Sequence, residues 1–389
     1  MDTSEKKEER SFSNRNLTLI YLNADIGSVF DSQVAYLLKS ISETAAFDRI
    51  IHLCGVKNQF EQERVSKALI SLDIEVVFFK SYPNYPFYNG FQQRAILDAF
   101  KQAKAPKESH IHIRGELLAS TALKPIMHVF YSLDNVVVDI RGAGREELSL
   151  YLKAPFWKVL LKKQNYRKAF ERLKKFPKIS VVSDALKRYI LLNAQIPNSR
   201  IHVVHCLAGE HFTFNEENRK RIRNALHVKH GEKLLVFSSG GNAGWQNTQG
   251  LMLLLSDKWT ILNLSKEVIN EGGIINKFIP YSEVPDYLNA ADAAIIFREK
   301  NIVNEVACPV KFCEYVCSGL PVISDTSVEE IVQYVNQSGS GLILENATEI
   351  NSVDIDDLVD EDRKHAAKQG RITYGEGTII RDYLNLYFN

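Results

Sequence analysis

The chain has 389 residues, more than a single hydrophobic core usually serves, so two domains are expected. Its 48 basic and 47 acidic residues give a net charge of +1, which argues against a dedicated nucleic-acid binder. The apolar fraction of 45% is ordinary for a globular protein, and no apolar run reaches the roughly 18 residues that span a membrane.

The N-terminal residues 1–16 are polar and charged without an apolar segment, so they predict a disordered leader rather than a signal peptide. The five cysteines do not make a disulfide framework for a chain of this size. The spacings of the last three also differ from the short cysteine pairs of zinc sites. We therefore expect buried thiols in a reducing cytoplasm, and no bound metal.

Short apolar runs alternate with helical stretches along the first half of the chain. Strands are predicted at 17–22, 49–54, 74–79, 110–113, 136–140, 179–182 and 202–204, with a helix near 32–42. The runs are continuous rather than alternating, which is typical of a parallel sheet buried on both faces. Residues 17–214 are therefore predicted to form an α/β domain.

The same pattern restarts after a polar segment at 215–233. Further strands are predicted at 234–238, 259–264, 274–279, 293–297, 321–323 and 341–344. Two doubly wound, Rossmann-like domains facing a central cleft are the expected architecture, with 215–378 as the second domain. The last segment, 379–389, is a candidate helix.

The stretch 305–324 is the most informative motif. Pro309 can start a helix, Gly319 can end it in a left-handed cap, and Pro321 prevents it from resuming. Lys311 lies in the first turn, where a bound anion would favour a cation, and Glu314 lies on the same face. A phosphate contact next to a carboxylate suits a nucleotide-sugar site. The alternative is a surface ion pair on an ordinary helix.

Two other places in the second half carry polar or glycine residues at strand ends. The glycine-containing loop 238–247 includes Gly240 and Gly241, which allow a backbone to approach a ligand closely, or it is a flexible turn. Arg298 follows the predicted strand 293–297, and its guanidinium suits phosphate geometry. A solvated strand end is the alternative for this residue.

The first half has polar residues at two strand ends, which point to a cleft rather than to a core. His112 and Arg114 end one strand, and Asp139 and Arg141 end another. Ligands bind beyond the carboxyl ends of parallel strands, so these residues are expected to line the cleft. The alternative is a structural role, above all for His112, which alternates with apolar neighbours and can face either side. The loop after the first strand contains a single glycine, Gly27.

A basic segment occupies 153–175, with nine basic residues against one acidic residue, Glu171. Aromatic and leucine side chains accompany the charges at roughly helical spacing. This pattern predicts a helix that docks on an anionic membrane surface, or a solvated helix face.

The stretch 298–324 resembles the donor-binding segment of family 4 glycosyltransferases, above all those that build bacterial capsule and O-antigen. The shared pattern is Ser-Pro-x-Lys-x-x-Glu-Tyr-x-x-x-Gly-x-Pro-Val, with Cys308 in place of the serine. Many relatives have two glutamates separated by seven intervening residues. The second matches Glu314, but Val306 stands in the position of the first, with Glu305 one place away.

The resemblance implies a retaining, metal-independent enzyme of the GT-B fold that uses a UDP- or GDP-sugar and needs no cofactor. Arg298, Lys311 and Glu314 become the expected catalytic residues. The expected donor-binding residues are Gly240, Gly241, Asn242, Gln246, Tyr281, Pro309 and Val310. Gln246 stands about where relatives carry a lysine, so Arg298 and Lys311 are expected to supply the missing charge.

The resemblance also implies partners and a location. The acceptor is expected to be a glycan or a lipid-linked saccharide, in a protein that is cytoplasmic or peripheral on the inner face of the cell membrane. The expected acceptor-side residues are Gly27, which corresponds to a glycine-rich acceptor loop of relatives, and His112, Arg114, Asp139 and Arg141. The C-terminal helix is expected to cross back to the first domain. Two other functions stay open: a nucleotide-sugar 2-epimerase of the same fold, and a non-catalytic sugar-nucleotide-binding partner of a membrane assembly.

Overall fold

In the computed structural model, residues 17–238, 258–345, 349, 358 and 362–389 are described. The predicted leader 1–16 lies outside them, as does most of the loop after the strand at 233–237. No helix among the described residues has both the length and the apolar character needed to cross a membrane.

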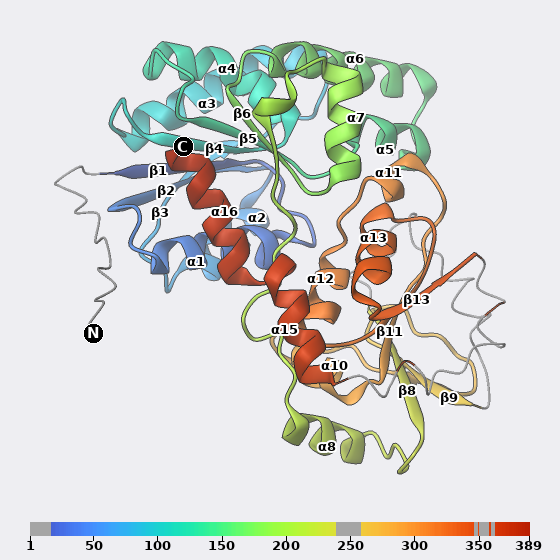
Figure 1. The fold of residues 1–389 in the computed structure, drawn as a ribbon. Helices are drawn as coiled ribbons and strands as arrows, with labels where there is room; N and C mark the ends of the chain where they lie inside the picture. The colour runs from blue at the N-terminus through green and yellow to red at the C-terminus, as the bar shows by residue number, and fades with distance from the viewer. Residues whose placement is uncertain (1–16, 239–257, 346–348, 350–357, 359–361) are drawn as a thin grey trace, which may run out of the picture.

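The first domain is built on a seven-stranded parallel sheet with the order β3-β2-β1-β4-β5-β6-β7 (Figure 1). Its strands are β1 (Thr18–Asn23), β2 (Arg49–Val56), β3 (Glu75–Lys80), β4 (His110–Arg114), β5 (Val136–Ile140), β6 (Lys178–Val181) and β7 (Ile201–Val203). Leu19 and Tyr21 face one core, whereas Ile20 and Leu22 face the other, because successive side chains of a strand point to opposite faces. The sheet is therefore buried on both faces.

Helices cover both faces of this sheet. They are η1 (Asp31–Ala35), α1 (Tyr36–Glu43), α2 (Gln59–Leu69), η2 (Pro86–Tyr88), α3 (Asn89–Ala103), α4 (Glu116–Val129), α5 (Gly144–Tyr151), α6 (Phe156–Leu173), α7 (Asp184–Ala194) and η3 (Asn198–Arg200). The helix predicted near 32–42 is a five-residue π-helix, η1, that continues into α1.

The second domain repeats the arrangement with a six-stranded parallel sheet, β10-β9-β8-β11-β12-β13. Its strands are β8 (Lys233–Phe237), β9 (Trp259–Asn263), β10 (Ile274–Asn276), β11 (Ala293–Ile296), β12 (Val322–Asp325) and β13 (Gly341–Leu344). Its helices include α8 (Glu216–Ala225), η4 (Tyr281–Glu283), α10 (Val284–Ala290), α11 (Ile302–Glu305), α12 (Val310–Cys317) and α13 (Glu329–Ser338). Ligands of such sheets bind where the strand order reverses, here beyond β8 and β11.

The C-terminal helices span the two domains. α15 (Arg363–Tyr374) packs against α12 of the second domain, and α16 (Glu376–Phe388) lies beside α1 on the first domain (Figure 1). The apolar side chains of α16, such as Ile379, Tyr383 and Leu386, are buried in the same core as Leu19 and Tyr21 of β1.

The basic segment 153–175 folds as α6, which packs closely on one side. Ala169, Phe170 and Leu173 are buried, and Arg172 donates to the carbonyl oxygen of Ser120 at 2.9 Å. The second half of 153–175 therefore packs within the first domain, and docking of this segment on a membrane stays a prediction. Only the first turns of α6 expose large apolar side chains, because its second half fills the space beside α4 and α7.

Candidate functional site

The helix predicted within 305–324 has the start and end that the sequence indicates. α12 begins at Val310, directly after Pro309, whose φ of −67° suits entry into a helix. Gly319 follows the helix with a φ of +71°, which glycine adopts without strain. A Cβ at Gly319 would lie 2.2 Å from the carbonyl oxygen of Arg363, so a larger residue does not fit there.

Three side chains form a polar cluster on the first turns of α12. The Glu314 carboxylate is buried, with Lys311 Nζ 2.8 Å from its Oε2 and the Tyr281 hydroxyl donating to its Oε1 at 2.9 Å. Lys311 Nζ also lies 5.4 Å from the centre of the Tyr281 ring. Burial, and then the Glu314 carboxylate, raise the pKa of Tyr281, so its hydroxyl stays a donor. The cluster lies beyond the carboxyl end of β11, where ligands of this sheet type bind.

Arg298 lies two residues after β11, and a neutral side chain holds its guanidinium. Nη1 donates to Oδ1 of Asn304 at 3.2 Å, and the buried Asn304 is itself held by the carbonyl oxygen of Glu299 at 2.8 Å. Burial lowers the pKa of Arg298 to about 10, so the side chain is charged at neutral pH. A cation whose hydrogen-bond partner is a neutral amide can still attract an anionic ligand.

The segment between Arg298 and α12 contacts the other domain. Val306 is buried, and its carbonyl oxygen accepts a bond of 2.7 Å from the Ser183 hydroxyl, whereas Glu305 is exposed. Val306 is therefore part of the contact between the two domains. Four of the predicted donor-binding residues lie outside the described residues: Gly240, Gly241, Asn242 and Gln246.

The prediction that His112 and Asp139 line the cleft is wrong, because both side chains are fully buried. His112 Nδ1 lies 2.8 Å from the hydroxyl of Tyr387, and its ring stacks on Tyr21 with centroids 4.5 Å apart. Tyr387 belongs to α16, which covers this part of the sheet. The two strand ends therefore support the returning helix.

Arg114 and Arg141 take part in the same network. Each has a guanidinium nitrogen 3.4 Å from an Asp139 oxygen, and Arg141 also donates to the Tyr383 hydroxyl at 3.2 Å. Burial alone would raise the pKa of Asp139, but Arg141, His112 and Arg114 together hold it well below its usual range. The two arginine side chains keep exposed fractions of only 9% and 16%, which leaves little surface for an acceptor.

The loop that contains Gly27 and the start of α4 meet where the strand order of the first sheet reverses. Asn23 holds this loop by accepting from the Asp25 backbone at 3.0 Å. Glu116, which the sequence reasoning missed, begins α4 and is buried, and burial raises its pKa to about 7. The sequence signal that could have identified Glu116 is its position, two residues after Arg114 at the end of a strand. A carboxyl that titrates near neutrality at such an edge is a candidate acid or base.

The two domains also touch beside this site. Asn301, which caps α11, donates to the Tyr151 hydroxyl of α5 at 2.7 Å. Further along the interface, Arg188 of α7 forms an ion pair with Glu329 of α13. Figure 1 shows α5 beside α11 and α7 beside α13. The two domains are thus in direct contact through α5 with α11 and through α7 with α13.

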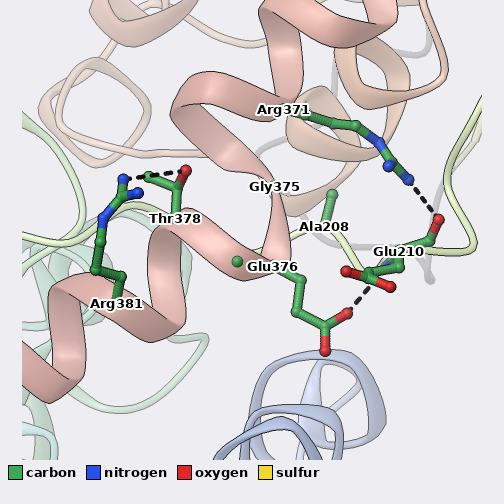
Figure 2. A pocket seen from close by; sticks show the side chains of 8 residues that line it. Ala208, Glu210, Arg371, Gly375, Glu376, Thr378 and Arg381 are labelled. Carbon is green, nitrogen blue, oxygen red and sulfur yellow. Dashed lines mark hydrogen bonds between the residues drawn. The ribbon is translucent and has the colours of Figure 1, made fainter. Parts of the chain in front are cut away.

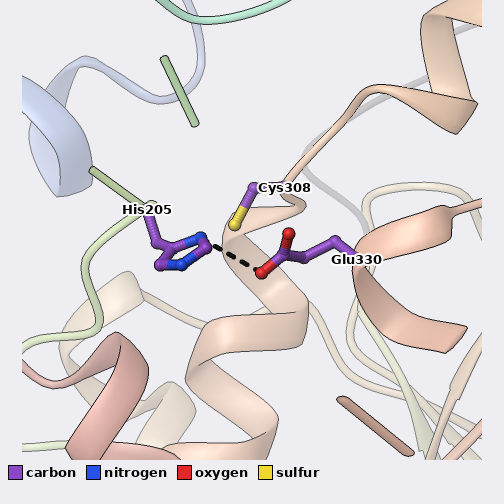
Figure 3. Close-up of side chains that lie close together, drawn as sticks. All are labelled: His205, Cys308 and Glu330. Carbon is purple, nitrogen blue, oxygen red and sulfur yellow. Dashed lines mark ion pairs between the residues drawn. The ribbon is translucent and has the colours of Figure 1, made fainter. Parts of the chain in front are cut away.

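A second polar group joins the domains through residues that the sequence did not single out. His205 Nδ1 lies 3.1 Å from Glu330 Oε1, next to the Cys308 thiol (Figure 3). Burial lowers the pKa of His205, but its bond to Glu330 raises it more, so the pKa is raised overall. The three donor atoms lie within 4.8 Å of one another, and such ligands suit a transition metal. Here the imidazole and carboxylate bind each other. All five cysteines are free and buried, as predicted.

A cavity of about 370 Å³ lies where the chain crosses between the domains (Figure 2). It is lined by Ala208, Glu210, Arg371, Gly375, Glu376, Gly377, Thr378 and Arg381. The Tyr36 hydroxyl and the Glu210 backbone both donate to Glu376, at 2.6 and 3.0 Å. None of the predicted site residues lines this cavity, so we assign it to the crossover between α15 and α16.

The repeated strand order and the returning helix can be compared with solved structures. A glycosyltransferase from Rickettsia africae matches with a TM-score of 0.69 at 13% identity, over 96% of this chain and 98% of that one. The chain has the GT-B fold. The expected two Rossmann-like domains are therefore confirmed.

Other GT-B structures match over similar lengths. HepE of Anabaena, solved in complex with UDP, has a TM-score of 0.67 at 12% identity over 95% of this chain and 99% of its own. WaaG, a glycosyltransferase involved in lipopolysaccharide biosynthesis, has a TM-score of 0.64 at 13% identity over 96% and 100%. A UDP-N-acetylglucosamine 2-epimerase has a TM-score of 0.55 at 12% identity over 95% of both chains. No protein-family model matches the chain, and no curated protein matches its sequence.

Proposed function

We propose that this GT-B protein is a retaining glycosyltransferase that moves a sugar from a nucleotide-diphosphate sugar to a glycan or lipid-linked saccharide. The observation that carries the proposal is the buried Glu314 carboxylate, held by Lys311 and Tyr281 at the carboxyl edge of the second sheet. The Glu314 side chain is only 1% exposed, so ribose hydroxyls would reach it once Lys311, which is 27% exposed, turns from the carboxylate to the diphosphate.

The donor diphosphate would bind between α12 and Arg298. The N-terminus of α12 carries a partial positive charge, and two cations would add to it: Lys311 in the first turn of α12, and Arg298 in the segment between β11 and α12. Tyr281 would lie near the nucleobase. HepE was solved with UDP and with UDP-glucose, which supports a UDP-sugar as the donor, with a GDP-sugar as the alternative.

Transfer requires stabilisation of the negative charge that builds up on the departing diphosphate. Arg298, Lys311 and the start of α12 would supply that stabilisation from fixed positions, without reorganisation during the reaction. This protein charge makes a metal ion unnecessary in the proposed mechanism. Retention would follow from reaction on one face of the sugar, with the leaving phosphate helping to deprotonate the acceptor, so no protein nucleophile is assigned.

The proposed biological role is synthesis of a bacterial surface polysaccharide, such as capsule or O-antigen, on the cytoplasmic side of the membrane. The motif at 298–324 and the structural likeness to WaaG support this role. The acceptor would enter from the first domain, past the Gly27 loop and Glu116.

A nucleotide-sugar 2-epimerase is the second candidate, favoured by Glu116. An epimerase removes and returns a proton, which needs a titratable group in the cleft, and Glu116 has a pKa of about 7. The fold is also shared with a UDP-N-acetylglucosamine 2-epimerase. A third candidate, a non-catalytic binding partner, is supported by Val306 standing in place of the first glutamate of the motif.

One set of measurements separates these functions. Thermal shift with UDP, GDP, CMP and ADP identifies the base, because a ligand that binds only the native state raises the melting temperature. Release of nucleoside diphosphate from a panel of nucleotide sugars, measured with and without saccharide acceptors and with EDTA, then tests transfer. Acceptor-dependent release that survives EDTA supports the proposal. An epimerised sugar formed without acceptor indicates an epimerase, and binding without turnover indicates a binding partner.

A further inference from the structure

The first domain carries an aromatic platform on the loop before η2, on η2 and at the start of α3, made of the half-buried Tyr82, Tyr85 and Tyr88 and the exposed Phe87 and Phe91. Phe87 and Phe91 are 62% and 60% exposed, although both are large and apolar. The rings touch one another, with centroids 4.6 Å apart for Phe87 and Tyr88 and 5.8 Å apart for Tyr82 and Phe91. A contiguous exposed group of this kind is typical of an interaction surface.

The first turns of α6 add a second exposed apolar group, the helix tip, made of Phe156, Trp157 and Leu160. These side chains are 81%, 56% and 57% exposed. α6 is fixed to the platform segment through Asn165, which bonds to Asn84 at 2.8 Å and to Asn89 at 3.0 Å. The platform and the helix tip therefore belong to one rigid part of the domain.

Two lysines, one helical turn apart, connect these groups. Lys162 Nζ lies 5.3 Å from the centre of the Tyr85 ring in the platform, and Lys158 Nζ lies 5.3 Å from the centre of the Trp157 ring in the helix tip. The segments 76–97 and 148–170, which carry both groups, contain eight basic residues and no acidic one. The whole chain has a net charge of only +1, so this positive charge is local.

We propose that the platform and the helix tip together dock the protein on a bilayer that contains anionic phospholipid. Exposed aromatic rings insert at the boundary of headgroups and acyl chains, while lysines beside them attract anionic headgroups. A surface with both features, carried by two segments that contain no acidic residue, is complementary to such a membrane. The proposed membrane contact is therefore made by two separate groups of side chains, the platform and the helix tip. The whole length of the basic helix α6 does not take part.

The position of the docking surface determines how the cleft is oriented relative to the membrane. This part of the proposal rests on the proposed function. The platform segment follows the carboxyl end of β3, and the helix tip begins five residues after Tyr151, which contacts Asn301 of the other domain. The docking surface therefore borders the carboxyl edge of the first sheet, which faces the cleft. A lipid-linked acceptor would reach the cleft directly from the membrane.

Co-sedimentation of the full chain with vesicles tests the proposal. We expect pelleting with vesicles of phosphatidylglycerol and phosphatidylcholine, little with phosphatidylcholine alone, and release by high salt. Two variants remove the surface: K158E/K162E/K163E, and F87S/W157S. The first is expected to weaken binding by about 100-fold and the second by at least about tenfold.

Matched controls lie elsewhere on the same domain. K101E/K107E/K124E makes the same charge change at exposed lysines away from the surface, and F60S replaces a phenylalanine that is 74% exposed on α2. Both should pellet like the wild type. Absence of wild-type pelleting with anionic vesicles, or equal loss in the control variants, would overturn the proposal. UDP binding is measured in every variant, so failure of the proposed donor site shows separately from failure of membrane docking.

Discussion

The hydroxyl of Tyr281 lies 2.9 Å from the buried carboxylate of Glu314 and donates a hydrogen bond to it. Tyr281 enters this contact from η4, before β11, whereas Glu314 comes from α12, after it. The bond holds the carboxylate in one orientation before any ligand arrives, and Lys311 holds its other oxygen. A fixed acceptor of this kind reduces the entropy lost when a polyol binds.

The first prediction concerns Glu314. In Glu314→Gln, one oxygen becomes an amide that cannot accept a bond, so affinity for UDP should fall by about 1 to 3 kcal/mol. Isothermal titration calorimetry measures this change, with circular dichroism as a check of folding. Glu305→Gln, which changes an exposed neighbour, is the control and should bind like the wild type. Unchanged UDP affinity in folded Glu314→Gln would remove this residue from the donor site.

The second prediction separates phosphate binding from base binding. Arg298→Ala and Lys311→Ala should each weaken UDP binding by about 1.5 to 3 kcal/mol, while binding of uridine changes much less, because only UDP carries the diphosphate. Lys300→Ala, which removes a nearby exposed cation, is the control. Equal losses for UDP and uridine would show that the two cations do not contact phosphate.

The third prediction concerns the buried network around Asp139. Removing its charge leaves Arg114 and Arg141 without their anion, so Asp139→Asn should lower the free energy of unfolding by about 3 to 5 kcal/mol at pH 7. The native pKa of Asp139 is depressed, so its contribution is present above about pH 4, the unfolded value, and is lost as the pH falls further. Urea denaturation at pH 7, 5 and 4 measures the difference in the free energy of unfolding between the wild type and Asp139→Asn. This difference should begin to decrease only at the lowest pH. The exposed Asp134→Asn is the control.

The fourth prediction concerns the contact between His205 and Glu330. The native pKa of His205 is raised, so its stabilising effect is full below about pH 6.5 and is lost as the pH rises through the native value. At pH 6, His205→Gln should lower the free energy of unfolding by about 1.5 to 3 kcal/mol, and the melting temperature should fall with it. Both decreases should be smaller at pH 8.5. The exposed His230→Gln should change neither value. A pH-independent loss in His205→Gln would indicate that the imidazole is neutral in the folded protein.

The start and end of α12 could be read from the sequence because they depend on neighbours in the chain. Pro309 cannot donate a backbone bond, and Gly319 accepts a left-handed conformation, whatever surrounds them. The parallel strands could also be predicted from the sequence, because a strand buried on both faces needs a continuous apolar run. The pairing of Lys311 with Glu314 follows from their spacing of three residues on one helix.

Whether the strand ends at His112 and Asp139 line a cleft or are buried depended on tertiary structure alone. Their polar side chains resemble cleft residues locally, but α16 returns to cover them and supplies Tyr383 and Tyr387 as partners, 244 and 275 residues further along the chain. The bond from Tyr281 to Glu314 and the contact of Asn301 with Tyr151 were likewise decided by packing. Local sequence determines which elements form, whereas the partner of a buried polar group is set by whichever distant segment excludes water from it.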